Sequence, residues 1–299
     1  MDYKVVCFGE ILWDRFGDVK KAGGAPMNVA FHLNKQGIST ELISAVGADE
    51  NGNELLTFLR EQGLTTSYVQ THSVLQTGVV DVYLDEKQQA TYNIVKPVAW
   101  DAINYSEKAG ELIRNADAVV FGSLACREET SKQTLLKLLA QAKFKVFDMN
   151  LRFPHFTTEL LEELLLLSDI VKLNEDELNY INELYEIKGW SEQEQLNFLL
   201  QKYRMQLICV TLGGDGAMVW DGATLYKHPG YTIEVADTVG AGDAFLASFI
   251  NGILKKEPIE TVLEKSCAAG ALIASLPGAN PHYTLADIYK LYQDQSKTS

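Results

Sequence analysis

The amino-acid sequence predicts an α/β protein with a doubly wound, mainly parallel sheet, helices on both faces of it and a smaller β-sheet beside it. Short apolar runs alternate with longer helical runs from Ser106 onward, which is typical of parallel strands joined by crossover helices. Residues 69–99 instead alternate polar and apolar side chains, which indicates a small sheet that projects from the main body. No internal repeat or low-complexity linker divides the 299 residues, so we expect a single domain over 1–299.

Composition excludes several classes of partner. The chain has 26 Lys and Arg against 40 Asp and Glu, a net charge of −14, and no basic patch, so its surface repels nucleic acid and anionic membranes. No apolar run approaches the ~18 residues of a membrane span. The four cysteines are scattered, without the spacing of a zinc site or a disulfide framework. With no signal-peptide pattern at the N-terminus, we expect a protein of the reducing cytoplasm.

The first predicted strand, Lys4–Phe8, is closed by Gly9 and leads to a candidate ligand residue. Asp14 follows the apolar run Ile11–Trp13, at the expected carboxyl end of a strand, which is where open α/β sheets bind ligands. Its carboxylate suits the hydroxyl groups of a polyol. A turn aspartate in a solvated loop is equally compatible with these residues.

A second organised stretch starts at Gly23. The pair Gly23 and Gly24 allows a flexible approach to a helix, and Pro26 suits its first turn. Asn28 would then project beside the glycine backbone and offer both a donor and an acceptor to a sugar hydroxyl. The alternative is an ordinary glycine-rich helix start.

The remaining elements follow from periodicity. We expect a strand over Thr40–Val46, a helix over Glu50–Gln62, and two insert strands, 78–84 and 90–95, around the polar turn 85–89. The later predicted strands are Asp117–Phe121, Lys145–Asp148, Asp169–Leu173 and Leu207–Leu212.

Polar groups follow three of these later strands. Asp148-Met-Asn-Leu-Arg152 places an arginine where it could contact a transferring phosphate or an acidic substrate; a surface arginine on a structural loop is the alternative. Asn174 and Glu177 stand at a strand-to-helix junction with the spacing of a capping box. Thr211-Leu-Gly-Gly-Asp-Gly216 is compatible with a tight hairpin turn on its own.

The stretch 237–245 is the one around which the chain is organised. We expect a strand over Tyr231–Ala236, a bare glycine turn, and a helix that starts near Asp243 and ends near Gly252. Backbone N–H groups at such a junction converge on an anion. An acidic side chain there repels phosphate in the ground state, so a general base explains Asp243 better than a binding role. A helix cap is the alternative.

The stretch Asp-Thr-Val-Gly-Ala-Gly-Asp-Ala-Phe (237–245) strongly resembles the C-terminal signature of the ribokinase-like (PfkB) family of small-molecule kinases, D-T-x-G-A-G-D-x-F. The stretch 23–30 resembles the family's N-terminal signature, G-G-x-P-x-N-x-A, and the runs at 174–177 and 211–216 resemble N-x-x-E and T-x-G-x-x-G. The resemblance covers essentially the whole chain and implies a ribokinase-like fold and an ATP-dependent sugar kinase.

The resemblance also implies residue roles. Asp243 is the expected base, and the amides of Gly240, Ala241, Gly242 and Asp243 receive the γ-phosphoryl group. The expected sugar ligands are Asp14, Gly23, Gly24, Asn28, Tyr92 and Arg152, with Trp13 as a further lining candidate, although core packing is the simpler role for either aromatic residue. The expected nucleotide ligands are Asn174, Thr211, Gly213, Gly214, Gly216 and Asn280.

Metal ions and a lid follow from the same resemblance. Glu177 would hold Mg²⁺ through water beside the ATP phosphates. Asp237 is a candidate ligand for a monovalent cation such as K⁺, although Val239 stands where ribokinase itself has a threonine. The segments 12–22 and 69–99 would form a β lid that excludes water, and its exposed edge favours a homodimer.

Several substrates and two other functions remain to be weighed. The runs 10–14 and 148–152 look most like fructokinases, with 2-keto-3-deoxygluconate kinases second and ribose or nucleoside kinases behind. Lys96 alone is too little basic charge for a phosphorylated sugar. A catalytically silent sugar or nucleotide sensor should lack the base or a glycine of the anion site, and both are intact. A dinucleotide-dependent dehydrogenase needs G-x-G-x-x-G after its first strand, which Gly9-Glu-Ile-Leu-Trp does not match.

Overall fold

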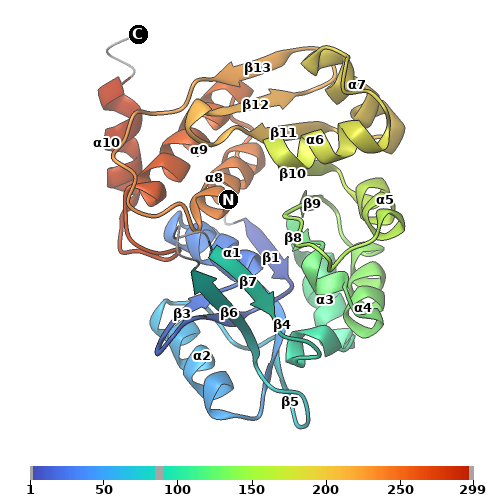
Figure 1. The fold of residues 1–299 in the computed structure, drawn as a ribbon, viewed down its shortest axis with the longest axis vertical. Helices are drawn as coiled ribbons and strands as arrows, with labels where there is room; N and C mark the ends of the chain where they lie inside the picture. Colours follow the sequence, from blue (N-terminus) through green and yellow to red (C-terminus); the bar gives the residue numbers. More distant parts are fainter. Residues whose placement is uncertain (1–2, 85–89, 296–299) are drawn as a thin grey trace.

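The structure is a computed structural model that describes residues 3–84 and 90–295, with the side chains of 82–84, 90–92 and 294–295 outside that description. Within these ranges the chain forms two sheets flanked by helices (Figure 1). The large sheet has nine strands in the order β13-β12-β11-β10-β9-β8-β1-β4-β5. Their bounds are β1 (Lys4–Phe8), β4 (Ser39–Gly47), β5 (Val69–His72), β8 (Ala118–Gly122), β9 (Lys145–Asp148), β10 (Ile170–Asn174), β11 (Leu207–Thr211), β12 (Ala217–Trp220) and β13 (Leu225–His228).

Apolar helix stripes cover both faces of the large sheet, as predicted. One face packs against α3 (Glu107–Asn115), α4 (Glu129–Leu139), α5 (Thr158–Leu167), α6 (Glu175–Leu184) and α7 (Glu192–Tyr203). The other packs against α1 (Ala25–Lys35), α2 (Glu50–Glu61), α8 (Ala241–Leu254), α9 (Ile259–Ala274) and α10 (Leu285–Gln295). Because helices bury the central strands on both sides, these strands are largely apolar, and β8, Ala-Val-Val-Phe-Gly, is apolar throughout.

The strand order places the candidate residues at one edge. The strands from β11 through β1 to β5 are parallel, whereas β12 and β13 are antiparallel to their neighbours. The carboxyl ends of the parallel strands therefore share one edge, where Glu10 follows β1 and Asp148, Asn174 and Thr211 end β9, β10 and β11. The chain reverses its direction of winding beside β1, and such switch points are where open α/β sheets bind ligands.

The small sheet includes fewer residues than the sequence predicts. It has the order β3-β2-β6-β7 and consists of β2 (Leu12–Phe16), β3 (Val19–Gly23), β6 (Gly78–Leu84) and β7 (Ala90–Ile94). The expected lid segment 69–99 is thus too long, because β5 pairs in parallel with β4 at the edge of the large sheet. An edge strand alternates polar and apolar residues just as a lid strand does, so the pattern could not separate the two. The predicted turn 85–89 lies outside the described residues.

The segment 231–236, predicted as a strand, is not assigned as a strand in the described part of the chain. The backbone N–H groups of Ala236 and Asp237 instead donate to the carbonyl of Ala274, at the end of α9. Tyr231, Ile233 and Val235 alternate because one side of this extended segment lines a cavity. The helix that follows it, α8, passes the predicted end at Gly252 and continues to Leu254.

Two general predictions agree with the described residues. All four cysteines are buried free thiols. Among the helices of the described ranges, none is long and apolar enough to cross a bilayer.

Candidate active site

The start of α8 forms an amide-lined turn because Gly240 allows it. Gly240 has φ 82°, and a Cβ on it would lie 2.7 Å from Cα of Ala279. A side chain is therefore excluded both by conformation and by space. The first-turn N–H groups of α8 have no carbonyl one turn earlier to bond, so those of Gly242 and Asp243 are available to an anion, whereas Ala241 donates to the carbonyl of Thr238.

Asp243 lies in this turn, half-buried, with an amide partner from α1. Asn28 Nδ2 donates to Asp243 Oδ2 at 2.7 Å. Burial and the carboxylate of Asp148 raise the pKa of Asp243 to about 6, while the Asn28 hydrogen bond, Lys172 and Arg152 oppose the rise. A carboxylate with a pKa just below neutrality is largely ionised at pH 7 and suits general-base chemistry.

Lys172 is a buried cation that the sequence analysis missed. It lies on β10 with 6% of its surface exposed, and its Nζ donates to Asp148 Oδ1 at 3.0 Å. Nζ also lies 3.3 Å from the position that a Cβ on Gly242 would take, directly behind the amide-lined turn. Burial lowers the pKa of Lys172, but the surrounding carboxylates outweigh burial and raise it above its usual value. The available signal was a lysine within the apolar strand Ile-Val-Lys-Leu.

Asp14 is near the site but not where the sequence placed it. It lies in the middle of β2, opposite Lys21 of β3, and not at the carboxyl end of a large-sheet strand. Residues 10–14 lead out of the large sheet into the small one, so the apolar run belongs to a different sheet than expected. Burial raises the pKa of Asp14 to about 6, and the cations of Arg152 and Lys21 oppose it.

The glycine pair gives close packing and not the flexible approach we expected. A Cβ on Gly23 would lie 2.3 Å from Asp14 Oδ2, and one on Gly24 would lie 2.4 Å from the carbonyl oxygen of Glu10. Gly24 also has φ 115°, a conformation that side chains disfavour. The pair thus lets the start of α1 lie directly against residues 10–14.

Asn28 and Asn280 contact each other. Asn28 is 5% exposed, and its Oδ1 accepts from Nδ2 of Asn280 at 2.9 Å while its Nδ2 donates to Asp243. The predicted sugar ligand therefore already has partners on both ends of its amide. Asn280 was predicted to bind nucleotide, but its side-chain donor faces Asn28 and it is not among the residues that line the nucleotide-sized cavity.

Arg152 and Glu10 complete the charged groups at this edge. Arg152 is exposed, its guanidinium donates to the carbonyl of its neighbour Leu151, and its charge reaches Asp14, Glu10 and Asp243. Glu10, also missed by the sequence analysis, is buried, and burial raises its pKa to about 7. The charge of Arg152 therefore acts on several carboxyl groups at this edge of the site.

The two predicted aromatic ligands differ in outcome. Trp13 is almost fully buried, donates to the carbonyl of Asn51 at 3.0 Å and packs edge-on against Phe58. It therefore has the packing role that the sequence analysis gave as its alternative. Tyr92 lies on β7 opposite Val82, and its side chain is outside the described part of the structure.

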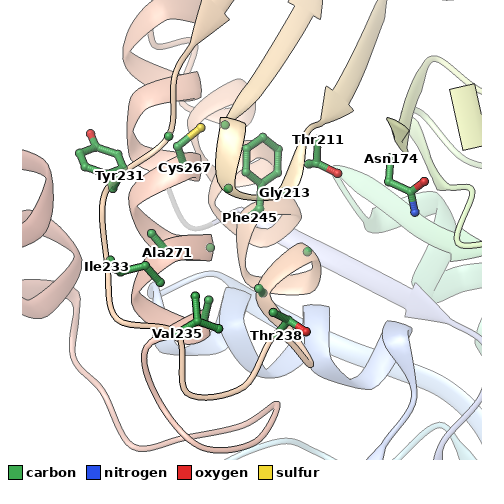
Figure 2. A pocket seen from close by; sticks show the side chains of 17 residues that line it. Asn174, Thr211, Gly213, Tyr231, Ile233, Val235, Thr238, Phe245, Cys267 and Ala271 are labelled. Atoms are coloured by element: carbon green, nitrogen blue, oxygen red, sulfur yellow. The ribbon is translucent and has the colours of Figure 1, made fainter. Parts of the chain in front are cut away.

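A cavity of about 330 Å³ joins the amide-lined turn to the predicted nucleotide residues. Figure 2 shows Asn174 and Thr211 on one side of it and Tyr231, Ile233 and Val235 on the other. Its polar lining includes the predicted set Asn174, Thr211, Gly213, Gly214 and Gly216, together with Ala241 and Gly242. The apolar side, which sequence analysis did not identify, suits a flat heteroaromatic ring, and the polar side suits phosphates.

Asn174 and Glu177 form the capping box that was their alternative role. Each accepts a hydrogen bond from the other's backbone N–H at 2.9 Å, and Glu177 Oε1 also accepts from the N–H of Leu151 at 2.7 Å. Burial raises the pKa of Glu177, and the charge of Lys172 opposes this.

A hydrated Mg²⁺ fits these residues better than a tightly caged metal. Asp148 Oδ2 is buried without a partner among the described residues. No group of three His, Cys, Asp or Glu residues in the described ranges could enclose an ion directly. Magnesium usually keeps several waters and takes few protein ligands, which matches isolated carboxylates beside a phosphate site.

Asp237 organises the loop that precedes α8. Its two oxygens accept from the backbone N–H groups of Val239 and Gly278, both at 3.1 Å. Lys21 Nζ of the small sheet lies 3.9 Å from Asp237 Oδ2. The residue thus joins three segments, and its role as a monovalent-cation ligand stays a prediction.

Comparison with known proteins shows the family to which the chain is related. The sequence model of the pfkB family carbohydrate kinases matches residues 3–284. The chain is similar to a putative sugar kinase of Pyrococcus horikoshii, 30% identical over 86% of this chain and 84% of the relative, and to the probable fructokinase-5 of Arabidopsis thaliana, 27% identical over 98% of both chains. The fold resembles that of a Xylella fastidiosa fructokinase solved with bound ATP, with a TM-score of 0.88, 22% identity and coverage of 99% of this chain and 100% of that one.

The family match spans nearly the whole chain, and the fold is ribokinase-like, as predicted. The protein therefore belongs to the PfkB family of carbohydrate kinases and is an ATP-dependent sugar kinase.

Proposed function

We propose that this sugar kinase transfers the γ-phosphoryl group of Mg-ATP to fructose, with Asp243 as the general base. The observation that carries the proposal is the position of the Asp243 carboxylate. It lies in the amide-lined turn that opens onto the cavity, and it accepts a hydrogen bond from Asn28 of α1. Similarity to fructokinases supports fructose over other sugars.

On the nucleotide side, the cavity would hold the adenine against Tyr231, Ile233 and Val235, with the phosphates toward Thr211 and the amides of residues 240–243. Phosphoryl transfer depends on positioning and on stabilising charge at the phosphoryl oxygens. The N–H groups of Gly242 and Asp243 supply hydrogen bonds, and Lys172 supplies positive charge behind them. Asp243 receives the proton of the attacking hydroxyl, typically a primary one.

Mg²⁺, when bound with ATP, would neutralise phosphate charge, held through water by Glu177, with Asp148 as an additional carboxylate. Asp237 would be the ligand of a monovalent cation such as K⁺. Neither carboxylate of the magnesium pair faces bulk solvent, since both Glu177 and Asp148 are buried. Because neither of them lines the nucleotide cavity, water would bridge them to the ion.

On the acceptor side, the sugar hydroxyl groups would bond Asp14, the backbone at Gly23 and Gly24, Asn28, Tyr92 and Arg152. The small sheet of β2, β3, β6 and β7 would act as a lid over them. Closure would keep water, which competes as a phosphoryl acceptor, away from the γ-phosphoryl group.

One observation favours 2-keto-3-deoxygluconate as a second candidate acceptor. The guanidinium of Arg152 is exposed and donates to the Leu151 carbonyl alone among the hydrogen bonds found in the described residues. Its remaining N–H donors could form the bidentate pair that arginine prefers with a carboxylate.

The test is a coupled ADP-release assay with Mg-ATP over fructose, 2-keto-3-deoxygluconate, ribose, adenosine and fructose 6-phosphate. We expect the highest kcat/KM for fructose. A higher value for 2-keto-3-deoxygluconate, lost in Arg152→Gln while activity on neutral sugars remains, would transfer the assignment to the acidic sugar. Turnover of none of the five would contradict the proposed acceptor class.

A further inference from the structure

Three side chains form a directional hydrogen-bond chain that ends on Asp243. Asn280 Nδ2 donates to Asn28 Oδ1 at 2.9 Å, and Asn28 Nδ2 donates to Asp243 Oδ2 at 2.7 Å. Nδ2 of an amide can only donate and Oδ1 can only accept. Because Asn280 Nδ2 donates to Asn28, the Oδ1 atom of Asn28 points toward Asn280 and its Nδ2 atom points toward the carboxylate of Asp243.

The loop that carries Asn280 is itself held in place by α1. His32, buried in α1, bonds the hydroxyl of Tyr283 through Nδ1 at 2.9 Å and the carbonyl of Ala279 through Nε2 at 3.1 Å. Because a carbonyl can only accept, Nε2 carries the proton and Nδ1 accepts from Tyr283. Burial lowers the pKa of His32 to about 4, so the ring stays neutral and keeps this tautomer near neutrality.

The same loop touches the amide-lined turn. Ala279 occupies the space beside Gly240 that a Cβ would need, and Gly278 N–H donates to Asp237 at 3.1 Å. The loop 276–283 therefore contacts both the turn that receives phosphate and, through Asn280 and Asn28, the base.

We propose that Asn280 is a positioning residue, which orients Asn28 so that Asp243 presents a fixed, ionised carboxylate to the acceptor hydroxyl. This inference rests on the proposed role of Asp243 as base. With one oxygen bonded to Asn28, the other oxygen of Asp243 remains to take the proton. The buried Asn28 amide thus serves the base in addition to any contact with the sugar.

The effect on Asp243 has a definite sign. The groups that act on it are Asp148 of β9 and Lys172 of β10, Arg152 of the loop after β9, and Glu10 after β1, in addition to Asn28 of α1. Burial and Asp148 raise its pKa to about 6, and the donor from Asn28 opposes them. Loss of this hydrogen-bond donor therefore raises the pKa of Asp243 further. When pH is lowered, the variant then loses the ionised base, and with it activity, at a higher pH than the wild type does.

The experiment compares Asn280→Ala and the isosteric Asn280→Asp with wild type, by pH profiles of kcat/KM for fructose, kcat and the KM for ATP. Neither variant can donate to Asn28. We expect about a tenfold loss of kcat, the size of one hydrogen bond, with an acid limb displaced to higher pH and a nearly unchanged KM for ATP. The carboxylate of Asn280→Asp repels the charge on Asp243 as well, so its limb should move further.

Asn251→Ala is the matched control. Asn251 of α8 donates to Gln36, the residue that follows α1, at 2.9 Å, so this amide pair also joins α8 to α1 but does not include Asp243. This variant should lower the melting temperature while the acid limb stays in place. Thermal melts show whether an Asn280 variant fails to fold. If Asn280→Ala does not fold, the isosteric Asn280→Asp is the variant that tests the proposal.

Three outcomes count against parts of the scheme in different ways. The positioning role is overturned if the acid limb stays in place in both Asn280 variants, or if the KM for ATP rises while the limb does not move. In either case the proposed base stands if Asp243→Asn is inactive. A fully active Asp243→Asn overturns the proposed base and the positioning role together.

Discussion

At the scale of single residues, the proposed chemistry depends on the proton affinity of Asp243. We expect Asp243→Asn to lower kcat by about 10²–10⁴, the usual loss for a general base, while the KM for ATP stays close to wild type because the amide-lined turn remains.

In the wild type, kcat/KM should fall as pH drops below about 6, since the pKa of Asp243 is raised to about 6 and only the ionised form accepts a proton. Steady-state rates across pH 5–8 measure both effects, and unchanged turnover in the variant would remove Asp243 from this role.

Lys172 and Asp148 form a buried ion pair at the site, and its contribution can be tested through the free energy of unfolding. Lys172→Met leaves the Asp148 carboxylate buried without its cation, so we expect the free energy of unfolding to fall by about 3–5 kcal/mol. Adding Asp148→Leu should recover much of the loss, because the double variant no longer buries the carboxylate to which Lys172 donates. Denaturant titrations measure both, and the exposed pair of Lys188 with Glu183 offers the control Lys188→Met, which should leave the unfolding midpoint unchanged.

At the scale of elements, the turn before α8 depends on a glycine. We expect Gly240→Ala to destabilise the protein by about 1–3 kcal/mol through its positive φ and the contact with Ala279, and to lower kcat by distorting the amide positions. Gly37 is a matched control, since its φ is 80° and a Cβ there meets no atom within 4 Å. Gly37→Ala should therefore cost backbone strain but keep kcat; equal losses of kcat in both variants would contradict the steric argument.

Elements were predictable where local pattern and tertiary surroundings agree. The central strands and the polar residues at their ends were predictable, because burial on two faces forces apolar runs and the sheet topology aligns their carboxyl ends. The segment 231–236 was mispredicted, because a loop that lines a cavity can alternate apolar and polar residues as a strand does. Asp14 was expected at the wrong sheet for a similar reason, since an apolar run does not reveal its pairing partner.

Contacts between distant segments could not be predicted from the sequence. Lys172 reads as one polar residue in a strand, and only the fold brings it behind Gly242. Asn28 carries a recognisable signature, but its bonds to Asp243 and Asn280 join positions more than 200 residues apart. Such partners are set by how the helices pack, which local periodicity does not encode.

At the scale of the whole molecule, the small sheet carries Asp14, which we propose as an acceptor ligand from outside the large sheet. We expect Asp14→Ala to raise the KM for fructose while the KM for ATP stays near wild type, because Asp14 lies on β2 and does not line the nucleotide cavity. Initial rates with each substrate varied in turn measure this. An unaltered KM for fructose would exclude Asp14 from sugar recognition. The free edges of this sheet are β3 and β7, and the predicted homodimer can be sought there by light scattering.

The separation of the two sheets has a consequence for how such an enzyme changes over time. The residues that we propose for phosphoryl transfer lie on interior strands of the large sheet and on α8, whereas the four-stranded small sheet carries Asp14 and Tyr92, two of the proposed acceptor ligands. Mutations in the small sheet can therefore change which alcohol is accepted without disturbing the residues proposed for phosphoryl transfer. Laboratory evolution aimed at new acceptors should accordingly randomise β2, β3, β6 and β7 first and leave the interior untouched.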